Sequence, residues 1–506
     1  MVKTNKQIIR GVLMLTYVLI IAILLFLISS LYSFLNTGAD RSKMLHTEVK
    51  KVEQYLPKVN WTLDGNEGRT ISQQKINAIE NDYLDAWYVK HIAYKTNTQV
   101  GIEDYYTKNA RKNIYSILKH NKLNKITIDA TTLLHNLDIE FFSEDGQLIV
   151  LKDNNVLEYK MILKEGKMIS EVSEVSNYRA VLLLEDGFWR IRHLVKETSE
   201  VFKDNLKETS IANTDIKGIN YYPQATPWNM YGDDFDIDII NNDFKVIKDA
   251  GLNTIRIFVP YEDFGKADVN QEKLEKLKQV LDVAEKINLK VVITLFDFYG
   301  NYEILDWTLN HRHAEIIVEK FKNHKAILAW DIKNEPNLDF DSRGKENVIA
   351  WLDYMIVLIK SIDKNHPVTI GWSNTKSATI LQDKVDVVSF HYYEDLDKFE
   401  SEYLTLEKNI KDDKPIILQE FGVSSYGGLW RPFVSSEEEQ ANYYKEIQKV
   451  LTKNSIPFMS WTLYDFDNIP KEVLGRLPWR TNPQKKFGFI SNTGKKKLSF
   501  KYISKE

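Results

Sequence analysis

Two glutamates in this 506-residue chain each follow an apolar run that is long enough to form one buried β-strand. Glu335 ends the run ILAWDIKNE, and Glu420 ends the run PIILQE. Continuous apolar runs of this length are typical of parallel strands that are buried on both faces. If both strands belong to one parallel barrel, their carboxyl ends face the same active-site mouth. Two facing carboxyl groups are the chemical requirement for hydrolysis of a glycosidic bond.

From residue 216 to the C-terminus, apolar runs alternate with amphipathic segments. The predicted strands are 217–222, 254–259, 290–296, 327–332, 368–372, 385–390, 416–419 and 458–463. Between two of them, Leu274, Leu277, Leu281 and Ala284 form one apolar stripe on a charged helix. Eight strands alternating with helices predict an α/β fold, a (β/α)8 TIM barrel. An open doubly wound sheet is the alternative, but no glycine-rich phosphate loop follows the first strand.

Polar and aromatic residues gather where the predicted strands end. They are Asn220, Tyr222, Arg256, Asp297, Asn334, Glu335, Trp372, Asn374, His391, Tyr393, Glu420, Trp461 and Asp465. Any one of these residues alone would be explained as a solvated loop or packing residue. A barrel built only for stability has no need of such a ring at one end, so we expect an active site there.

Along residues 215 to about 500 the chain resembles the clan A retaining glycoside hydrolases, closest to the cellulase-like enzymes of family 5. The motifs that carry the resemblance follow the family's order on successive strands: Arg256, Asn334-Glu335-Pro336, His391-Tyr392-Tyr393, Glu420 in QEFG, and Trp461. The resemblance implies that Glu335 is the acid/base and Glu420 the nucleophile. It also implies that Arg256 lies beside the nucleophile and that Trp461 is an aromatic platform. Asp297 departs from the pattern, because many members carry a histidine there, and this leaves the preferred sugar open.

The implied roles make physical sense. In a retaining hydrolase the two carboxyl groups lie ~5–5.5 Å apart. Arg256 and the Tyr393 hydroxyl would favour the charged form of Glu420, and that charge would keep Glu335 protonated. Asn334 is predicted to hydrogen-bond the sugar 2-hydroxyl. The other predicted substrate-binding or supporting residues are His391, Tyr222, Asp297, Trp372 and Trp461, with Trp307 and Trp430 as weaker candidates for further sugar subsites.

Neither a cofactor nor a metal is predicted. His311 and His313 would point apart on the helix predicted there, and we expect them at the surface. The acidic stretch 233–243 lacks the spacing and central glycine of a calcium loop. The chain has no cysteine, which excludes disulfides and thiolate ligands. With a net charge of −4 and no basic stretch interleaved with aromatic residues, nucleic-acid binding gets no support.

The N-terminus predicts a membrane anchor. Residues 12–35 are almost all apolar, long enough to cross ~30 Å of hydrocarbon as a helix. Lys3, Lys6 and Arg10 precede the run, so residues 1–36 are predicted to be a cytoplasmic stub and a single transmembrane helix, with the remainder of the chain extracytoplasmic. A cleaved signal peptide is the alternative, but the apolar run is long for one.

Three segments separate this helix from the barrel at 216–506. Residues 37–68 are predicted to be a stalk and residues 197–215 a linker. Between them, residues 69–196 contain two helical patterns followed by strands and the phrase GFWRIRHL, and this order resembles the NTF2-like α+β superfamily. Asp82, Asp85 and His91 could line the cone of such a domain, but we expect them to be exposed polar residues on a helix.

Together these patterns predict a membrane-anchored, extracytoplasmic, retaining β-glycoside hydrolase of O-glycosyl bonds, similar to endo-β-glucanases or β-mannanases. Its substrate would be a β-linked polysaccharide or oligosaccharide, such as a cell-surface polymer that it trims. The alternative is a non-catalytic barrel that holds a nascent polysaccharide near its export machinery. Gluco- against manno-specificity, endo- against exo-action and the oligomeric state stay open at this point.

Overall fold

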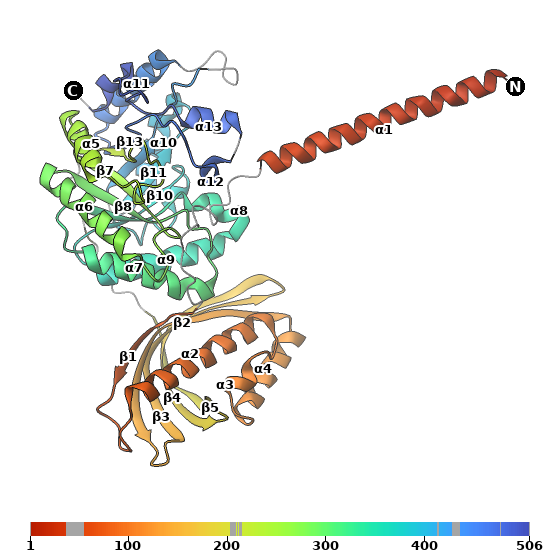
Figure 1. Ribbon diagram of the computed structural model, residues 1–506, viewed down its shortest axis with the longest axis vertical. Coiled ribbons are helices and arrows are strands. Elements are labelled where there is room, and N and C mark those ends of the chain that lie inside the picture. Colours follow the sequence, from red (N-terminus) through yellow and green to blue (C-terminus); the bar gives the residue numbers. More distant parts are fainter. Residues whose placement is uncertain are drawn as a thin grey trace.

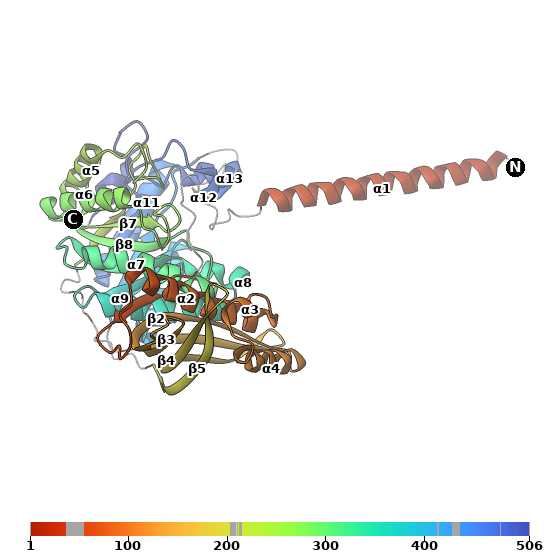
Figure 2. The same ribbon diagram turned by 60° about the horizontal axis from the view of Figure 1, so that its bottom comes forward.

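The structure is a computed structural model that describes residues 2–36, 55–202, 209, 211, 215–411, 414–427, 436–475 and 477–504 (Figure 1). It consists of an N-terminal helix α1 (Val2–Asn36), an α+β domain and a parallel barrel. In both ribbon views the α+β domain lies against the side of the barrel that carries helices α7 (Trp307–Phe321) and α9 (Lys345–Ile362) (Figures 1 and 2).

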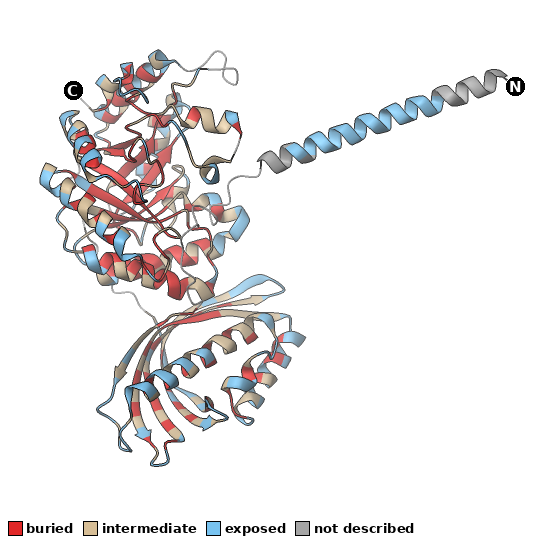
Figure 3. Cartoon of the chain, in the orientation of Figure 1, coloured by how far each residue is buried: buried red, intermediate tan, exposed pale blue. Residues whose placement is uncertain are grey.

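The barrel is closed by eight parallel strands in sequential order, which confirms the predicted fold class. The strands are β6 (Lys217–Asn220), β7 (Thr254–Pro260), β8 (Lys290–Asp297), β9 (Ile327–Asn334), β10 (Val368–Trp372), β11 (Val388–Tyr392), β12 (Ile416–Phe421) and β13 (Phe458–Trp461). The ring closes where Trp461 of β13 pairs with Asn220 of β6. The strands are buried and the surrounding helices are exposed on their outer faces (Figure 3).

Amphipathic helices cover the outside of the barrel. Besides α7 and α9, they are α5 (Ile237–Asp249), α6 (Gln271–Ile287), α10 (Leu396–Asn409) and α11 (Glu437–Lys453). The short helices α8 (Phe340–Arg343), α12 (Lys471–Leu474) and α13 (Pro478–Gln484) lie in the connections that follow β9 and β13. Four short 3-10 turns, η2 (Ile304–Asp306), η3 (Pro336–Asp339), η4 (Ser377–Thr379) and η5 (Leu498–Tyr502), complete the described connections. The stripe of Leu274, Leu277, Leu281 and Ala284 is buried on α6, as predicted.

The α+β domain consists of three helices followed by four long strands, the order predicted from the sequence, and a short strand before the helices completes a five-stranded sheet. Its elements are β1 (Lys58–Thr62), α2 (Gln73–Thr96), α3 (Ile102–Tyr105), α4 (Ala110–Leu123), β2 (Ile126–Phe142), β3 (Leu148–Lys164), β4 (Lys167–Glu185) and β5 (Phe188–Val201). Strands β2 to β5 are antiparallel neighbours, and β1 pairs in parallel with β2. Its relation to the NTF2-like superfamily stays a prediction.

Two predicted boundaries of this domain differ from the structure. Residues 58–62, expected in the stalk 37–68, form the edge strand β1, because their backbone pairs with residues 134–138 of β2. Strand β5 continues to Val201, into the segment expected to be a linker, because it pairs with β4 over its full length. The rest of the predicted stalk up to residue 54, and residues 203–208 of the linker, lie outside the described residues.

The interior of the α+β domain is more polar than the sequence suggests. His91 is 2% exposed and stacks on Trp87 at 5.7 Å, so the expectation of an exposed histidine is wrong. Beneath it, the His135 ring lies 2.6 Å from a carboxylate oxygen of Asp153, and the Tyr83 hydroxyl donates to the same oxygen at 2.9 Å. Pairing of this kind offsets the cost of burying the polar groups of His135, Asp153 and Tyr83.

An aromatic contact joins the two domains. Trp307, at the start of α7, is fully buried between Tyr159 of β3 at 4.3 Å and Tyr354 of α9 at 5.1 Å. The Leu56 amide donates to the hydroxyl of Thr308 at 3.0 Å beside it. Trp307 therefore stabilises the domain interface, and the weaker prediction that it forms a sugar subsite is wrong.

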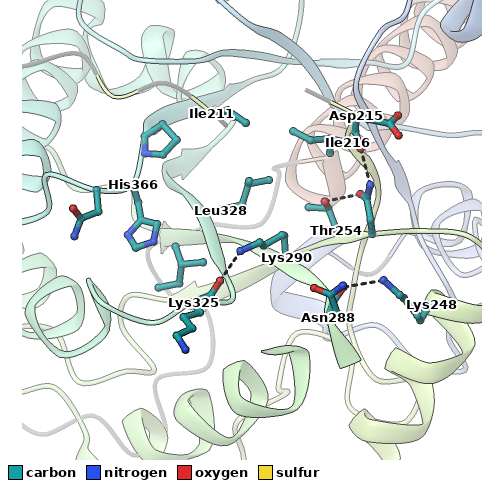
Figure 4. A pocket seen from close by; sticks show the side chains of 14 residues that line it. Ile211, Asp215, Ile216, Lys248, Thr254, Asn288, Lys290, Lys325, Leu328 and His366 are labelled. Atoms are coloured by element: carbon teal, nitrogen blue, oxygen red, sulfur yellow. Dashed lines mark hydrogen bonds between the residues drawn. The ribbon is translucent and has the colours of Figure 1, made fainter. Parts of the chain in front are cut away.

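A cavity of about 400 Å³ lies at the amino ends of the barrel strands (Figure 4). Its lining includes Ile216, Thr254 and Lys290, which lie at the beginning of the first three strands. Two of the three lysine ammonium groups there are bound to the backbone: Lys290 donates to the Lys325 carbonyl at 2.6 Å, and Lys248 to the Asn288 carbonyl at 2.9 Å. Active sites of such barrels lie at the opposite end, so we interpret this end as structural.

Helix α1 contains one stretch, Gly11–Ser29, that is long and apolar enough to cross a membrane. Its apolar side chains are exposed along the helix (Figure 3). A signal sequence near an N-terminus also contains an apolar helix, so this stretch is compatible with either interpretation.

Candidate active site

A pocket of about 150 Å³ lies at the carboxyl ends of the barrel strands. It is lined by Tyr222, Trp228, Phe258, Asp297, Phe298, Asn334, Glu335, Glu420, Trp461, Val473, Leu474 and Gln484. Six of the predicted site residues, Tyr222, Asp297, Asn334, Glu335, Glu420 and Trp461, are in this lining. The strand ends thus bring together side chains that are up to about 240 residues apart in the sequence.

Glu335 and Glu420 face each other across this pocket. One carboxylate oxygen of each lies, together with a ring nitrogen of His391, in a group whose atoms are all within 4.8 Å of one another. The side chain of Glu335 is 18% exposed and that of Glu420 is 11% exposed, so both reach the pocket from a largely buried position. The two acids predicted from the strand ends therefore meet at one point.

Glu420 is held by two hydrogen-bond donors. Arg256 donates to one carboxylate oxygen at 3.1 Å, and the hydroxyl of Tyr393 donates to the other at 2.7 Å. Burial of that hydroxyl and the nearby charge of Glu420 raise the pKa of Tyr393 well above its usual value. Tyr393 therefore remains a donor at any working pH, although its residue as a whole is 43% exposed. Charge-assisted bonds of this kind stabilise an ionised carboxylate.

Arg256 uses every N–H group of its guanidinium within the site. Two bonds reach Asp331, at 3.1 and 2.7 Å, and single bonds reach Asn220 at 3.0 Å, Glu420 at 3.1 Å and Asn334 at 2.9 Å. Burial lowers the pKa of Arg256, but the charges of Asp331 and Glu420 outweigh it and the net shift is upward. Since arginine has five N–H donors, none is left for another ligand.

Asp331 belongs to the same hydrogen-bonded cluster, and the sequence analysis missed it. It is fully buried in β9, accepts from Arg256 and from the Thr294 hydroxyl at 2.7 Å, and accepts the Gly371 amide at 2.9 Å. An unpaired buried carboxylate would be very costly, so an aspartate inside an apolar strand was itself the signal that an internal cation was near.

His391 lies under the pocket between the two glutamates. Its Nδ1 is 3.0 Å from Glu335 and 4.0 Å from Glu420, and the ring is fully buried. A β-carbon placed on Gly371 would lie 3.1 Å from its Nε2 and 2.6 Å from the Gln419 side-chain oxygen. Position 371 therefore needs glycine, because a larger residue would push the histidine out of its place.

An aromatic wall forms one side of the pocket. The ring of Tyr222 is stacked on Phe258 at 5.1 Å and lies 5.2 Å from Trp228. The Trp461 ring is close to all three, roughly perpendicular to Tyr222 and Phe258 and tilted against Trp228. Asp297 stands beside this wall, where its carboxylate accepts from the Tyr222 hydroxyl at 3.3 Å. Trp228 was missed by the sequence analysis because it lies in a loop with no periodic pattern.

Several pocket residues have an unusual backbone. Glu335, Phe298 and Trp228 have φ values of 49°, 59° and 62°, in the left-handed region that non-glycine residues rarely occupy. The Glu335 amide is fixed by a bond to the Gly371 carbonyl at 2.7 Å. Each such residue costs ~1–3 kcal/mol, and residues of this kind cluster at functional sites.

Other predicted residues lie elsewhere. Trp372 is 1% exposed and packs on Phe340 of α8, outside the pocket lining, so the prediction that it binds substrate is wrong. His311 and His313 do point apart, but both are buried rather than at the surface, and His313 contacts the Lys266 and Leu295 carbonyls. Trp430 lies outside the described residues.

Glu335, His391 and Glu420 are also the described residues that could surround a cation. The guanidinium of Arg256 lies 3.1 Å from Glu420, on the same oxygen that faces His391. Its positive charge would repel a divalent ion at that distance, so the donor set does not fit a metal well.

A closed eight-stranded barrel with facing carboxylates at its carboxyl end has the architecture of a barrel glycosidase. The family described as "Cellulase (glycosyl hydrolase family 5)" matches residues 209–467, and the chain belongs to this family. The match begins just before β6 and ends beyond β13, so it covers the whole ring of strands.

The curated relatives are distant. Human (Homo sapiens) β-glucuronidase is 24% identical over 286 residues, which are 51% of this chain and 40% of the relative, so the chain spans well under half of that protein's length. Mannan endo-1,4-β-mannosidase A of Emericella nidulans is 22% identical over 40% of this chain and 67% of the relative. The solved exo-β-1,4-mannosidase of Opitutaceae bacterium strain TAV5 is 17% identical, with a TM-score of 0.47, over 56% of this chain and 57% of that one.

Proposed function

We propose that the protein is a retaining β-glycoside hydrolase that cleaves a β-linked polysaccharide or oligosaccharide by double displacement. The observation that carries this proposal is the approach of Glu335 and Glu420, whose oxygens lie within 4.8 Å across the pocket. Retaining enzymes place their carboxyl groups ~5–5.5 Å apart, whereas inverting enzymes need ~6.5–9.5 Å to admit a water between them. The separation favours a direct attack by one carboxylate.

Glu420 is the proposed nucleophile. Its two oxygens accept from Arg256 and Tyr393, and these bonds keep it ionised and aimed at the pocket. In the first step a Glu420 oxygen forms a bond to the anomeric carbon while the bond from that carbon to the leaving oxygen breaks. The leaving oxygen takes a proton from Glu335, so a neutral alcohol departs and a covalent glycosyl–enzyme remains.

Glu335 is the proposed acid/base. Its side chain is the more exposed of the two and is held from beneath by His391. In the second step Glu335 takes a proton from water, the water oxygen bonds to the anomeric carbon, and the ester bond to Glu420 breaks. This restores both carboxyl groups and releases a sugar with the original anomeric configuration.

Asn334 is the proposed contact to the sugar 2-hydroxyl. Arg256 donates to its side-chain oxygen, so the amide nitrogen is the end turned away from the arginine and toward the pocket that Asn334 lines. A donor at this position strengthens its bond as the transition state forms. Trp461 and Tyr222 supply apolar ring surface for the C–H faces of the sugar.

The test separates the two carboxyl roles. Glu335→Gln should lower kcat ~10²–10⁴-fold for substrates with poor leaving groups, and much less for activated aryl glycosides that need no proton. Glu420→Gln should abolish turnover on both. A 2-deoxy-2-fluoro glycosyl fluoride should label Glu420 in the parent enzyme, as read by peptide mass spectrometry. Inversion of the product anomer in proton NMR, or full activity of either variant, would contradict the assignment.

We also place the enzyme at the cell membrane, with the N-terminus inside and the barrel outside. The support is the apolar stretch Gly11–Ser29 with Lys3, Lys6 and Arg10 before it. The chain has no cysteine, so single engineered cysteines give unambiguous labels. In intact cells an impermeant maleimide should modify Lys167→Cys and leave Lys6→Cys unmodified until the cells are opened. The reverse pattern would refute this topology, and a shortened mature chain would indicate a cleaved signal.

An anchored barrel works close to the surface that holds it. We therefore propose that the substrate is a polysaccharide of the cell's own envelope, which the enzyme trims. Deletion of the gene should lengthen or retain that polymer, and restoration with the Glu420→Gln variant should not reverse the change. An unchanged polymer in amount, length and attachment would argue against this role.

A further inference from the structure

We propose that the pocket receives a single, non-reducing terminal sugar, and that this sugar is a hexose without a carboxylate whose hydroxyl groups bind Asp297. This inference rests on the proposed hydrolase and names its substrate class. It follows from the size of the pocket, the charges of its lining and the donors that remain in its walls.

The pocket has room for about one sugar ring. Its volume is about 150 Å³, whereas pockets that hold drug-sized ligands measure ~300–1,000 Å³. One wall comes from the C-terminal segment of the barrel, through Val473 and Leu474 of α12 and Gln484 of α13. An enzyme that cuts within a chain needs several sugars on both sides of the catalytic acids, and this wall leaves little space for them.

The chemistry of the reaction decides which end of the polysaccharide lies in the pocket. Glu420 lines the pocket and attacks the anomeric carbon of the sugar that lies in it. The broken bond is therefore the one from that sugar to the rest of the polymer. If only one sugar fits on this side of the bond, it must be the non-reducing terminal residue, and the released product is a monosaccharide.

The charges of the described lining disfavour a uronic acid. Asp297, Glu335 and Glu420 are the carboxyl groups of its described lining, and no lysine, arginine or histidine is among the described residues that line it. Arg256 lies beneath, but all five of its N–H groups are already bonded within the site. A sugar carboxylate would lose its water here, would face the carboxyl groups of the lining and would find no free N–H group of Arg256 to replace that water, which is unfavourable.

The pocket walls instead suit hydroxyl groups. Asp297 is 3% exposed and its carboxylate offers only acceptors. Trp461 offers the opposite: its indole N–H is buried and has no hydrogen-bond partner within the described part of the chain. A hydroxyl can donate to the first and accept from the second, and buried polar groups of this kind are normally satisfied by a ligand or by protein. The φ of 59° at Phe298 fixes the chain direction directly after Asp297.

The first experiment compares nitrophenyl β-glycosides of glucose, mannose, glucosamine and glucuronic acid. We expect kcat/KM for at least one of the first three to exceed that for the glucuronide by ~10²-fold or more. Asp297→Asn keeps the shape of the side chain and removes its charge. It should lower kcat/KM for the preferred sugar ~10–10²-fold and reduce the ratio of that kcat/KM to the kcat/KM for the glucuronide. Asp249→Asn, at the exposed end of α5, is the matched control and should change neither value.

A glucuronide that is cleaved as fast as the other sugars, or an Asp297→Asn variant with unchanged preference, would overturn the inference while the hydrolase proposal stands. If no glycoside is cleaved and the fluorosugar labels nothing, both proposals fail. These outcomes are therefore distinguishable, because labelling of Glu420 reports the hydrolase and the ratio between sugars reports the pocket.

The second experiment tests the chain end. A β-linked oligosaccharide that carries a fluorophore at its reducing end should lose one sugar at a time, with a monosaccharide as the first product. Leu474→Ala removes part of the wall and should raise the share of disaccharide released. Internal cuts by the parent enzyme, seen as short fluorescent fragments at the earliest times, would overturn exo-action.

Discussion

Replacement of Arg256 by lysine keeps the positive charge beneath the pocket but removes the planar guanidinium group, whose N–H donors point in several directions. The guanidinium serves Asp331, Asn220, Asn334 and Glu420 with five N–H groups. An ammonium group has three donors on one atom and cannot span four partners. We expect it to stay with Asp331, which is fully buried and makes the shortest bond at 2.7 Å.

The magnitude follows from the bonds that are lost. A hydrogen bond to a charged group contributes ~1.5–3 kcal/mol, and one between a charged and a neutral partner lies near the lower end of that range. Loss of the bonds to Glu420 and Asn334 should therefore lower kcat/KM ~10²–10³-fold, because ~1.4 kcal/mol corresponds to a factor of ten. The free energy of unfolding should fall by ~2–4 kcal/mol, because Asn220 also loses its partner.

Steady-state kinetics on an activated aryl glycoside and urea unfolding followed by tryptophan fluorescence measure these two quantities. Asn334→Ala is the partner variant, since part of the Arg256→Lys effect should act through the orientation of Asn334. The double variant should then lose less activity than the product of the two single effects. Fully multiplicative effects, or an Arg256→Lys enzyme within threefold of the parent, would refute this account of the arginine.

Three further predictions concern stability, metals and strain. Burial raises the pKa of Glu158, but Lys160, Tyr178 and Lys90 outweigh burial and lower this pKa to about 2. The stability that ionised Glu158 contributes is therefore complete above its unfolded pKa near 4.5 and is lost as the pH falls toward 2. Glu158→Gln should make the free energy of unfolding less dependent on pH in this range, and an unchanged dependence would contradict the pairing. Excess EDTA should leave kcat/KM unchanged, because Arg256 opposes a cation beside Glu420, and a loss that zinc or calcium restores would be a contrary result. The free energy of unfolding of Glu335→Gly, measured with urea, should exceed that of Glu335→Ala by ~1 kcal/mol, because glycine accepts the φ of 49°. Equal free energies would show that the backbone there is not strained.

The sequence was sufficient to predict the barrel and its strand ends because both depend on local patterns. Buried parallel strands are continuous apolar runs, and the polar residue that ends each run is visible in one dimension. The two glutamates, Arg256 and Tyr393 were found in this way and lie in contact. Edge strand β1 was missed because residues 58–62 are mixed in polarity, and only pairing with β2 makes them a strand.

The error at Trp372 has a simple geometric cause. Successive residues of a strand point to opposite sides of the sheet. Gly371 faces the barrel interior, where a β-carbon would lie 3.0 Å from Arg256. The next residue must therefore face outward, and Trp372 packs on Phe340 of α8. Position at a strand end predicts closeness to the site, but the direction of the side chain decides whether it enters the site, and at Trp372 the alternation turns it away.

Irregular strand pairing explains why alternation alone could not have located the site acids. Between Asp331 and Asn334, β9 advances three residues while β10 advances two. Before Asp297, β8 advances three residues while its neighbour β7 advances two. Before Glu420, β12 advances two residues while its neighbour β11 advances one. An extra residue of this kind bends a strand and re-aims the side chains that follow.

These extra residues allow one strand to contribute two side chains to the site at different depths. Without the one in β9, strict alternation would turn Asp331 and Asn334 to opposite faces of the sheet, since they are three residues apart. With it, both reach Arg256, at 2.7 and 2.9 Å. The arginine is thereby held from below by a buried acid and presents its other edge to Asn334 and Glu420. The three acids of the pocket each follow such an irregularity. Whether they meet in the pocket therefore depends on the register of neighbouring strands, which no single run of residues encodes.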